Sequence, residues 1–331
     1  MNISENIILN KQILEDSFQR KHDYLRISLI DKCNLRCQYC MPDEDMKFFS
    51  QNKLMTAEEI FEIASTFVDL GVNKIRLTGG EPLLRKDADK IIKQLSQLPV
   101  NLCITTNGVL ADEFINIFKQ AGIKSVNISL DTLNNGKFFE ITKRNHFTKV
   151  VNNIHLLMNE GFHVKVNLVV MKGVNDNELS EFISFTHHYP VHIRFIEFMP
   201  FTGNAWSEKK LFTYEEMLER IKSTFIIEKL EDKIHSTAKK YKVSGYRGTF
   251  AFITTMSTPF CGDCNRLRLT ADGKMKNCLF SKGEADILSV LRNGEDIIPV
   301  IKKCVSMKAA SMGGQTDPMN MENRSMILIG G

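Results

Sequence analysis

The sequence predicts an α/β fold, an incomplete parallel barrel of six strand–helix units followed by a smaller α+β domain. Short extended segments alternate with amphipathic helical ones over roughly the first 220 residues, which is typical of parallel strands joined by right-handed crossovers. Nearly every extended segment has one polar face. After about residue 220 the alternation ends and the rest is strand-rich. We therefore expect two domains, residues 1–220 and 221–331.

The expected elements follow from hydrophobic periodicity. Six strands are expected, at Tyr24–Ile30, Asn73–Thr78, Asn101–Thr106, Ser125–Leu130, His163–Val170 and His192–Phe198. Helices are expected at Thr56–Leu70, Asp87–Leu95, Asp112–Ala121, Phe147–Glu160 and Asp176–His187. The first helix has a start signal, since Thr56 precedes Glu58 and Glu59, and Gly71 follows its end.

The alternation of strands and helices fits either an open doubly wound sheet or a barrel, and the polar strand faces favour a barrel with a polar lumen. A parallel sheet covered on both faces is apolar throughout. Here, because side chains alternate along a strand, one face collects Arg26, Ser28, Lys74, Arg76, Thr78, Thr105, Asn107, Asn127, Ser129, Asp131, Lys165 and Asn167. The alternative is a solvent-exposed face of a one-layer sheet, which helices between the strands disfavour. Buried charge without partners is costly, so the lumen is predicted to hold an anionic ligand.

Composition narrows the class of protein. The 331 residues carry a net charge of +4, which requires no nucleic-acid partner and permits a small anionic substrate. No apolar run approaches the roughly 20 residues that span a bilayer, so no membrane partner is expected. Residues 1–20 lack the pattern of a signal peptide. A cytoplasmic location is therefore expected, where structural disulfides are rare.

Six of the eight cysteines form two triplets, Cys33/Cys37/Cys40 and Cys261/Cys264/Cys278. In a reducing compartment such clusters indicate metal ligands, whereas the isolated Cys103 and Cys304 are expected in the core. The first triplet follows the first strand, where parallel α/β folds place their ligands. A structural zinc site needs four protein ligands, whereas a 4Fe–4S cluster on three thiolates keeps one iron open. The alternative is zinc completed by a remote residue such as His22.

The spacing Cys-x3-Cys-x2-Cys, with Tyr39 before the last cysteine, resembles the radical S-adenosylmethionine (SAM) superfamily. The resemblance implies that the open iron chelates SAM, which the reduced cluster cleaves to methionine and a 5′-deoxyadenosyl radical. Gly80 and Glu81, in Thr-Gly-Gly-Glu-Pro after the second strand, correspond to the SAM amino-group site. Ser129 corresponds to a SAM-contacting serine, and Met199 to the position whose backbone meets adenine.

The second triplet is followed directly by arginines. Arg266 and Arg268 flank Leu267 at strand spacing, so they face the same way, and guanidinium groups suit phosphate oxygens. A zinc knuckle on a nucleic-acid-binding module is the alternative, although basic and aromatic residues do not interleave here. We expect one positive funnel, lined by Arg26, Lys74, Arg76, Lys165, Arg194, Arg266 and Arg268.

The N-terminal triplet, Cys261-x2-Cys264-x13-Cys278, Asn-Arg-x-Arg and the terminal Gly330-Gly331 together resemble the GTP 3′,8-cyclase family of molybdenum cofactor biosynthesis, from about Tyr24 to Gly331. The resemblance implies a second 4Fe–4S cluster facing guanine, a triphosphate on the Arg and Lys side chains, and substrate contacts that include Thr105 and Leu267. Radical attack at ribose C3′ and closure onto C8 then give (8S)-3′,8-cyclo-7,8-dihydro-GTP. The tail glycines are expected to act in the active site.

The resemblance also sets the expected partners. These are GTP, SAM, an electron donor and, acting next, the accessory cyclic pyranopterin monophosphate synthase. The oligomeric state stays open, with a homodimer as the candidate. The chain departs from the family pattern at Ile30, at Gln19-Arg20, where a glycine usually precedes the arginine, and in Ala309–Met321. The rival interpretations are a radical SAM peptide maturase with an auxiliary cluster and a zinc-stapled nucleic-acid-binding protein.

Overall fold

The computed structural model describes residues 13–41 and 46–331; residues 1–12, on which the signal-peptide expectation partly depends, lie outside it. One twelve-stranded sheet has the order β12-β11-β10-β1-β2-β3-β4-β5-β6-β9-β8-β7. Its centre consists of consecutive parallel strands: β1 (Tyr24–Ser28), β2 (Lys74–Thr78), β3 (Asn101–Thr106), β4 (Ser125–Ser129), β5 (His163–Val170) and β6 (His192–Glu197). Each lies within two residues of its predicted bounds.

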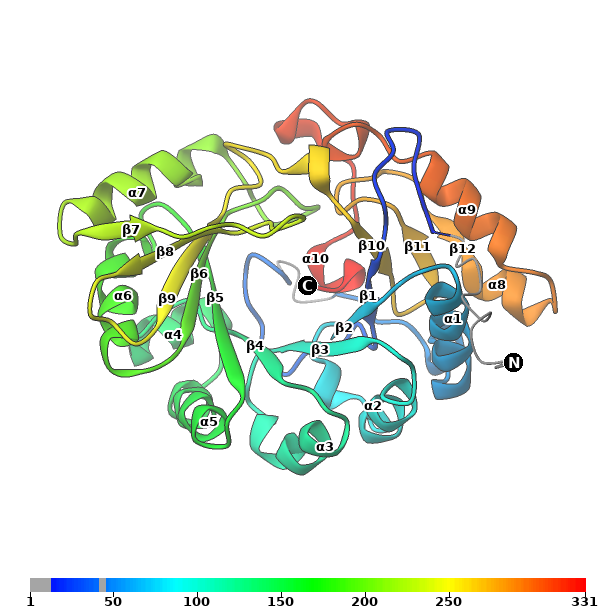
Figure 1. The fold of residues 1–331 in the computed structure, drawn as a ribbon, viewed down its shortest axis with the longest axis horizontal. Coiled ribbons are helices and arrows are strands. Elements are labelled where there is room, and N and C mark those ends of the chain that lie inside the picture. Colours follow the sequence, from blue (N-terminus) through cyan, green and yellow to red (C-terminus); the bar gives the residue numbers. More distant parts are fainter. Residues whose placement is uncertain (1–12, 42–45) are drawn as a thin grey trace, which may run out of the picture.

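Helices follow these strands and cover the outer side of the curved sheet, while the C-terminal helix lies on its inner side (Figure 1). The helices of the first part are α1 (Ala57–Asp69), α2 (Ala88–Leu95), α3 (Ile115–Gln120), α4 (Asn135–Thr142), α5 (Phe147–Asn159), α6 (Leu179–His188) and α7 (Tyr214–Lys222). Thr56 and Glu59 form a capping box at the start of α1, as the start signal predicts. Two predicted helices begin as 3-10 turns, and α4 was not predicted.

The apolar faces of the strands form the core beneath these helices. Leu25, Ile27, Ile75 and Leu77 have no exposed surface and belong to one large hydrophobic cluster with helix residues such as Ile60. Burying such side chains stabilises the fold by roughly 1.5–3 kcal/mol each. The polar faces are therefore left on the concave inner side, as the barrel hypothesis predicts.

The C-terminal part extends the sheet at both edges. Its elements are β7 (Ile227–Lys229), β8 (Lys239–Val243), β9 (Thr249–Ile253), β10 (Arg266–Leu269), β11 (Lys274–Lys276), β12 (Ala285–Asp286), α8 (Ile287–Arg292), α9 (Ile298–Ser306) and α10 (Met326–Ile329). Strand β9 pairs in parallel with β6, and β10 with β1. The remaining partners are antiparallel hairpin strands. An incomplete barrel with an added α+β part is thus confirmed.

Short 3-10 turns complete the chain: η1 (Gln51–Lys53), η2 (Pro82–Leu84), η3 (Ala111–Phe114), η4 (Asp176–Glu178), η5 (Glu208–Lys210), η6 (Cys261–Asp263), η7 (Met312–Gly314) and η8 (Pro318–Asn320). Across residues 13–41 and 46–331, no helix combines the length and the apolar composition needed to cross a bilayer.

Candidate active site

The first cysteine triplet lies on the loop after β1, with all three side chains partly buried. Burial and the negative charge of Glu81 raise the pKa of Cys33 to about 11. Burial, Asp131 and the other two thiols raise the pKa of Cys37 well above its ordinary value. The thiols therefore lie close enough to interact, and the positive charge of bound irons would reverse the penalty on their thiolates.

Among the residues that the structure describes, no three His, Cys, Asp or Glu side chains are arranged to hold a single metal ion. A 4Fe–4S cluster makes a different demand, since its cysteines bind separate irons and need not converge on one point. The partly buried, mutually interacting thiols of the first triplet fit such a cluster.

The turn after β2 packs tightly against the cysteine loop. Gly80 N donates to Ile30 O at 2.7 Å, and Glu81 N donates to Lys32 O at 2.8 Å. A Cβ on Gly80 would lie 2.4 Å from Lys32 O, so only glycine fits. The Glu81 carboxylate has no exposed surface. It accepts hydrogen bonds from Leu83 N (3.0 Å), Thr106 Oγ1 (2.8 Å) and Asn107 N (2.7 Å), and burial raises its pKa to about 7.

Other residues predicted to contact SAM surround the same loop. The Tyr39 hydroxyl donates to Asp131 Oδ2 at 2.6 Å, which fixes the cysteine loop to the end of β4. Ser129 is the last residue of β4 and is partly buried. Met199 follows β6, and its carbonyl accepts from Asn204 Nδ2 at 2.8 Å.

The second triplet is assembled from two turns. Cys261 is the first residue of η6 (Cys261–Asp263), Cys264 directly follows η6 and precedes β10, and Cys278 follows β11. Lys308 Nζ lies 3.6 Å from Cys264 Sγ and donates to Cys264 O (3.3 Å) and Arg266 O (3.1 Å). Burial raises the pKa of Cys264, but Arg266 and Lys308 lower it more, to about 7. The thiolate required for metal binding is therefore favoured at this position.

The N-terminal segment holds the second triplet in place. Arg20 is buried, and its guanidinium donates to Cys261 O (2.8 Å), Ala310 O (2.8 Å), Ala309 O (2.7 Å) and Asp16 Oδ2 (2.6 Å). Gln19 has φ 64°, a left-handed conformation that favours glycine. This conformation explains why the family usually has glycine before this arginine. With Gln19 at that position, Arg20 still makes its contacts.

The stretch Ala309–Met321, unplaced by sequence, packs beside the same cysteines. Besides the two carbonyls that Arg20 binds, Met312 N lies 3.5 Å from Cys261 Sγ. Ile30, which also departs from the family pattern, precedes the cysteine loop, and its backbone oxygen accepts the hydrogen bond from Gly80 N.

A cavity of about 890 Å³ opens on the concave face of the sheet, lined by the second triplet, Met199, Met326 and Gly331. The predicted funnel is assembled there, from Arg26, Lys74, Arg76, Lys165, Arg194, Arg266 and Arg268. None of these cations forms an ion pair with an Asp or Glu side chain of residues 13–41 or 46–331.

Crowding of like charge marks the cavity as an anion site. Burial and the charges of Arg194 and Arg76 lower the pKa of Lys165 to about 7. Burial raises the pKa of Tyr24, but Arg76, Arg26 and Lys74 lower it to about 7. The buried Nε donors of Arg26, Arg194 and Arg266 also lack partners, which is rare in folded proteins. A polyanion such as a triphosphate would satisfy both the charge and the donors.

The C-terminal tail ends inside this cavity. Arg268 Nη1 donates to Gly330 O at 2.6 Å, and Arg26 Nη2 donates to Gly331 O. Gly330 has φ 87°, and a Cβ there would lie 2.7 Å from Ser28 Cβ and 2.8 Å from Thr78 Oγ1. The tail therefore lies against the ends of β1 and β2, toward the first cysteine loop.

Two residues that were predicted to contact the substrate, Leu267 and Thr105, are placed differently from the cations that line the cavity. Leu267 is wholly buried in the hydrophobic core, because it alternates with Arg266 and Arg268 along β10, so its side chain cannot line the cavity. Thr105 Oγ1 accepts from Arg76 Nη1 at 3.4 Å, so it orients a cavity cation.

Comparisons with known proteins match nearly the whole chain. Residues 27–186 match the radical SAM superfamily, and residues 191–313 match the family "Molybdenum Cofactor Synthesis C". A GTP 3′,8-cyclase of Thermodesulfovibrio yellowstonii is 43% identical over 328 residues, 96% of this chain and 100% of that protein. The chain belongs to the GTP 3′,8-cyclase family.

Other members of the GTP 3′,8-cyclase family are longer. The mitochondrial GTP 3′,8-cyclase of Arabidopsis thaliana is 45% identical, over 96% of this chain and 84% of that protein. The molybdenum cofactor biosynthesis protein 1 of Bos taurus is 47% identical over 96% of this chain but 51% of its own length, so the chain spans about half of such relatives. Family membership confirms the predicted cofactors, SAM and two 4Fe–4S clusters.

A solved structure supports the fold alone. Streptococcus suis SuiB bound to S-adenosylmethionine has a TM-score of 0.64 at 16% identity, over 93% of this chain and 72% of that one.

Sequence reasoning missed several residues around the cavity and the two cysteine triplets. Tyr24, whose hydroxyl accepts from Arg76 Nε at 2.6 Å, begins the same strand face as Arg26 and could have been included. Lys308 and Arg20 gave no such signal, because their contacts with the second triplet join segments more than 40 residues apart.

Proposed function

We propose that this chain is a GTP 3′,8-cyclase, a radical SAM carbon–carbon lyase that converts GTP to (8S)-3′,8-cyclo-7,8-dihydro-GTP in the first step of molybdenum cofactor biosynthesis. The observation that carries the proposal is the cavity of about 890 Å³, lined by cations that have no Asp or Glu partner among the described residues and by three arginine Nε donors without a hydrogen bond. A nucleoside triphosphate supplies the missing negative charge.

Strand order supports the placement of two cofactor sites around one substrate. The first triplet follows the C-terminal end of β1, and Cys264 precedes the N-terminal end of β10, its parallel neighbour. At about 3.3 Å per residue, the strand separates the two cysteine sites by more than 10 Å. GTP between them would direct its guanine to the second triplet and its ribose to the first.

When bound, the first cluster and SAM would supply a 5′-deoxyadenosyl radical and methionine; abstraction of hydrogen from ribose C3′ would give 5′-deoxyadenosine and allow the sugar to close onto guanine C8. Two electrons from a reductant and one proton balance the conversion. The chain's own residues bind and orient the substrate: Arg266, Arg268 and the other funnel cations hold the triphosphate. Gly330 and Gly331 occupy space that water would otherwise fill near the reacting ribose.

The proposed SAM contacts are the residues around the first loop, Tyr39, Gly80, Glu81, Ser129 and Met199. Glu81 already accepts three hydrogen bonds, so we assign it first the task of holding the glycine turn against the cysteine loop. Residues 1–220 would hold the first cluster and SAM, and residues 221–331 the second cluster and the tail.

The further partners are also proposals. An electron donor would supply the reducing equivalents, and a cyclic pyranopterin monophosphate synthase would take the product. A homodimer and a cytoplasmic location remain predictions from the sequence.

The test is anaerobic turnover of the reconstituted chain with GTP, SAM and reductant. GTP deuterated at C3′ should give deuterated 5′-deoxyadenosine and the cyclised nucleotide, identified by mass and NMR. SAM cleavage that leaves GTP intact and modifies a peptide would favour the maturase. A colourless protein with stoichiometric zinc would support the nucleic-acid-binding alternative.

A further inference from the structure

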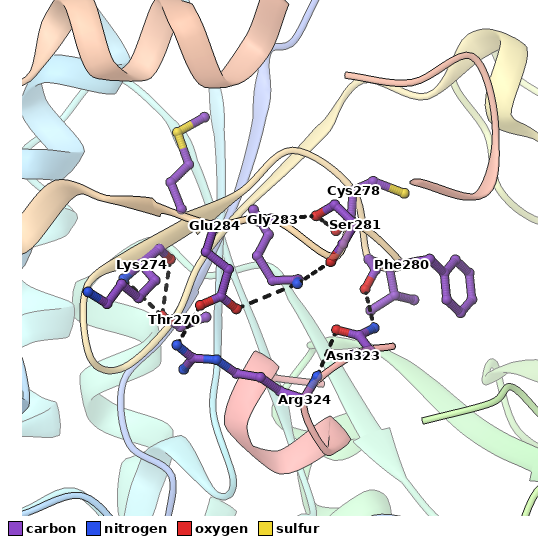
Figure 2. Close-up of polar contacts among 12 residues, drawn as sticks. Thr270, Lys274, Cys278, Phe280, Ser281, Gly283, Glu284, Asn323 and Arg324 are labelled. Carbon is purple, nitrogen blue, oxygen red and sulfur yellow. Dashed lines mark hydrogen bonds and ion pairs between the residues drawn. The ribbon is translucent and has the colours of Figure 1, made fainter. Parts of the chain in front are cut away.

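The tail is fastened to the loop that carries Cys278, the third cysteine of the second triplet. Gln315 Nε2 donates to Phe280 O at 2.5 Å, and Asn323 Nδ2 donates to Leu279 O at 2.8 Å. Figure 2 shows Asn323, from the segment before α10, beside Phe280 of this loop. The residues directly after Cys278 thus hold the chain just before α10.

Arg324 is the strongest of these attachments. Its Nη1 lies 2.9 and 3.0 Å from the two oxygens of Asp272. Its Nη2 lies 2.5 Å from Glu284 Oε2, and Figure 2 shows the Arg324 and Glu284 side chains pointing toward one another. Asp272 lies in the β10–β11 turn, and Glu284 precedes β12, so both carboxylates belong to the sheet edge around Cys278. The Arg324 side chain is 24% exposed, and such forked charged contacts are among the strongest hydrogen bonds in proteins.

The carboxylate partner is itself linked to the cysteine loop. Glu284 pairs with buried Lys276 at 3.5 Å, and Lys276 Nζ donates to Ser281 O at 2.5 Å. Ser281 N and Oγ donate to Cys278 O at 3.3 and 3.0 Å. A continuous chain of contacts therefore leads from Arg324 to the backbone of Cys278.

Beyond Arg324 the tail continues straight into the cavity. Ile327 and Ile329 of α10 are 1% exposed, and Ile329 packs with Phe201 and Phe280 in a small cluster of its own. Gly330 and Gly331 then meet Arg268 and Arg26. Arg324 is the last charged residue before these glycines.

We propose that Arg324 is a positioning residue for the terminal glycines: by clamping Asp272 and Glu284 it docks the tail on the Cys278 loop, so that Gly330 and Gly331 stay at Arg268 and Arg26. The docking itself is a property of the structure. Only its effect on the reaction rests on the proposed function.

The direct test is release of the C-terminal glycines by carboxypeptidase from the reconstituted protein, followed by intact mass. Arg324→Ala should release Gly331 and Gly330 roughly tenfold faster than wild type, as expected for loss of a charge-assisted contact. Arg324→Lys, which keeps the charge but not the fork, should fall between. The matched control is Arg292→Ala, which removes a similar paired contact with Glu59 at the surface, on α8.

A second readout links docking to the reaction, as cyclised product per 5′-deoxyadenosine. Arg324→Ala should lower this ratio while iron content and the spectra of both clusters stay at wild-type values. Asp272→Asn should reproduce the effect if Arg324→Ala folds poorly. Release of the glycines from Arg324→Ala and Asp272→Asn at the wild-type rate would overturn the proposal. A wild-type protein that forms no cyclised product would overturn the proposed function and leave the release experiment standing.

Discussion

Replacing Gly330 by alanine tests whether the tail must be seated in the cavity. Gly330 has φ 87°, and a left-handed conformation costs an alanine about 1–2 kcal/mol. The new Cβ would also lie 2.7 Å from Ser28 Cβ and 2.8 Å from Thr78 Oγ1, well inside the usual contact distance of about 3.5 Å. Together, these two effects should destabilise the docked position of the tail by at least about 2 kcal/mol. This corresponds to a roughly 30-fold shift of the equilibrium from the docked to the undocked tail.

Gly331→Ala is the matched control. Its added Cβ would find only Met326 Cε, at 3.7 Å, which is ordinary contact. The assay is cyclised product per 5′-deoxyadenosine under anaerobic turnover. Gly330→Ala should lower this ratio at least tenfold by displacing the tail, as should deletion of Gly330 and Gly331, while folding, both clusters and GTP affinity are retained. Equal ratios for Gly330→Ala and wild type, or equal losses for the two alanine variants, would refute the argument.

Three further predictions concern the charges and the metal. Arg266→Ala and Arg268→Ala should each weaken GTP binding about 10- to 150-fold, from roughly 1.5–3 kcal/mol per charged contact. Only Arg268→Ala should also lower product per 5′-deoxyadenosine, because Arg268 holds Gly330 O; wild-type GTP affinity in both variants would contradict the triphosphate site. Reconstituted protein should contain about eight irons per chain. Alanine at Cys33, Cys37 or Cys40 should abolish SAM cleavage, whereas alanine at Cys261, Cys264 or Cys278 should impair GTP turnover more; zinc in place of iron would contradict this. Lys165, with a pKa of about 7, loses its charge above neutrality, so GTP affinity should fall from pH 7 to 9, and less so in Lys165→Met. The free energy of unfolding of the ligand-free protein should rise over the same pH range. The reason is that the pKa of Lys165 in the folded protein lies below the ordinary 10.5, so unfolding takes up a proton. If Lys165→Met left the pH profiles of GTP affinity and of stability unchanged, both expectations would be contradicted.

The sequence predicted the central sheet well because two local signals agree there. Apolar residues such as Leu25 and Ile27 repeat every second position, and the helices between strands carry their own caps, as at Thr56. The same alternation placed Arg26 and Arg76 on the inner face. It also shows that the Leu267 side chain, between two inward arginines, points outward into the core, so only the backbone of Leu267 could contact a substrate.

The rest depends on contacts between distant segments. Strand β10 lies beside β1, so that Arg26 pairs in register with Arg268, 242 positions later. No local pattern in either segment specifies that neighbour. Arg20 and Lys308 likewise act on the second triplet only after the chain ends have come together. Alternation and spacing could predict the chemistry of each cysteine triplet and the cations of the cavity, but not which distant segments of the chain become neighbours around them.

The pairing of β1 with β10 and of β6 with β9 has a consequence for producing the two parts separately. Residues 1–220 expressed alone would carry bare backbone donors and acceptors along both outer strands of the barrel, β1 and β6. Such uncovered edges recruit other chains, so this fragment should self-associate and precipitate. Supplying residues 221–331 in trans should restore solubility only if both edges are covered at once. The two parts would then be partners in folding as well as in chemistry, and neither half would persist without the other.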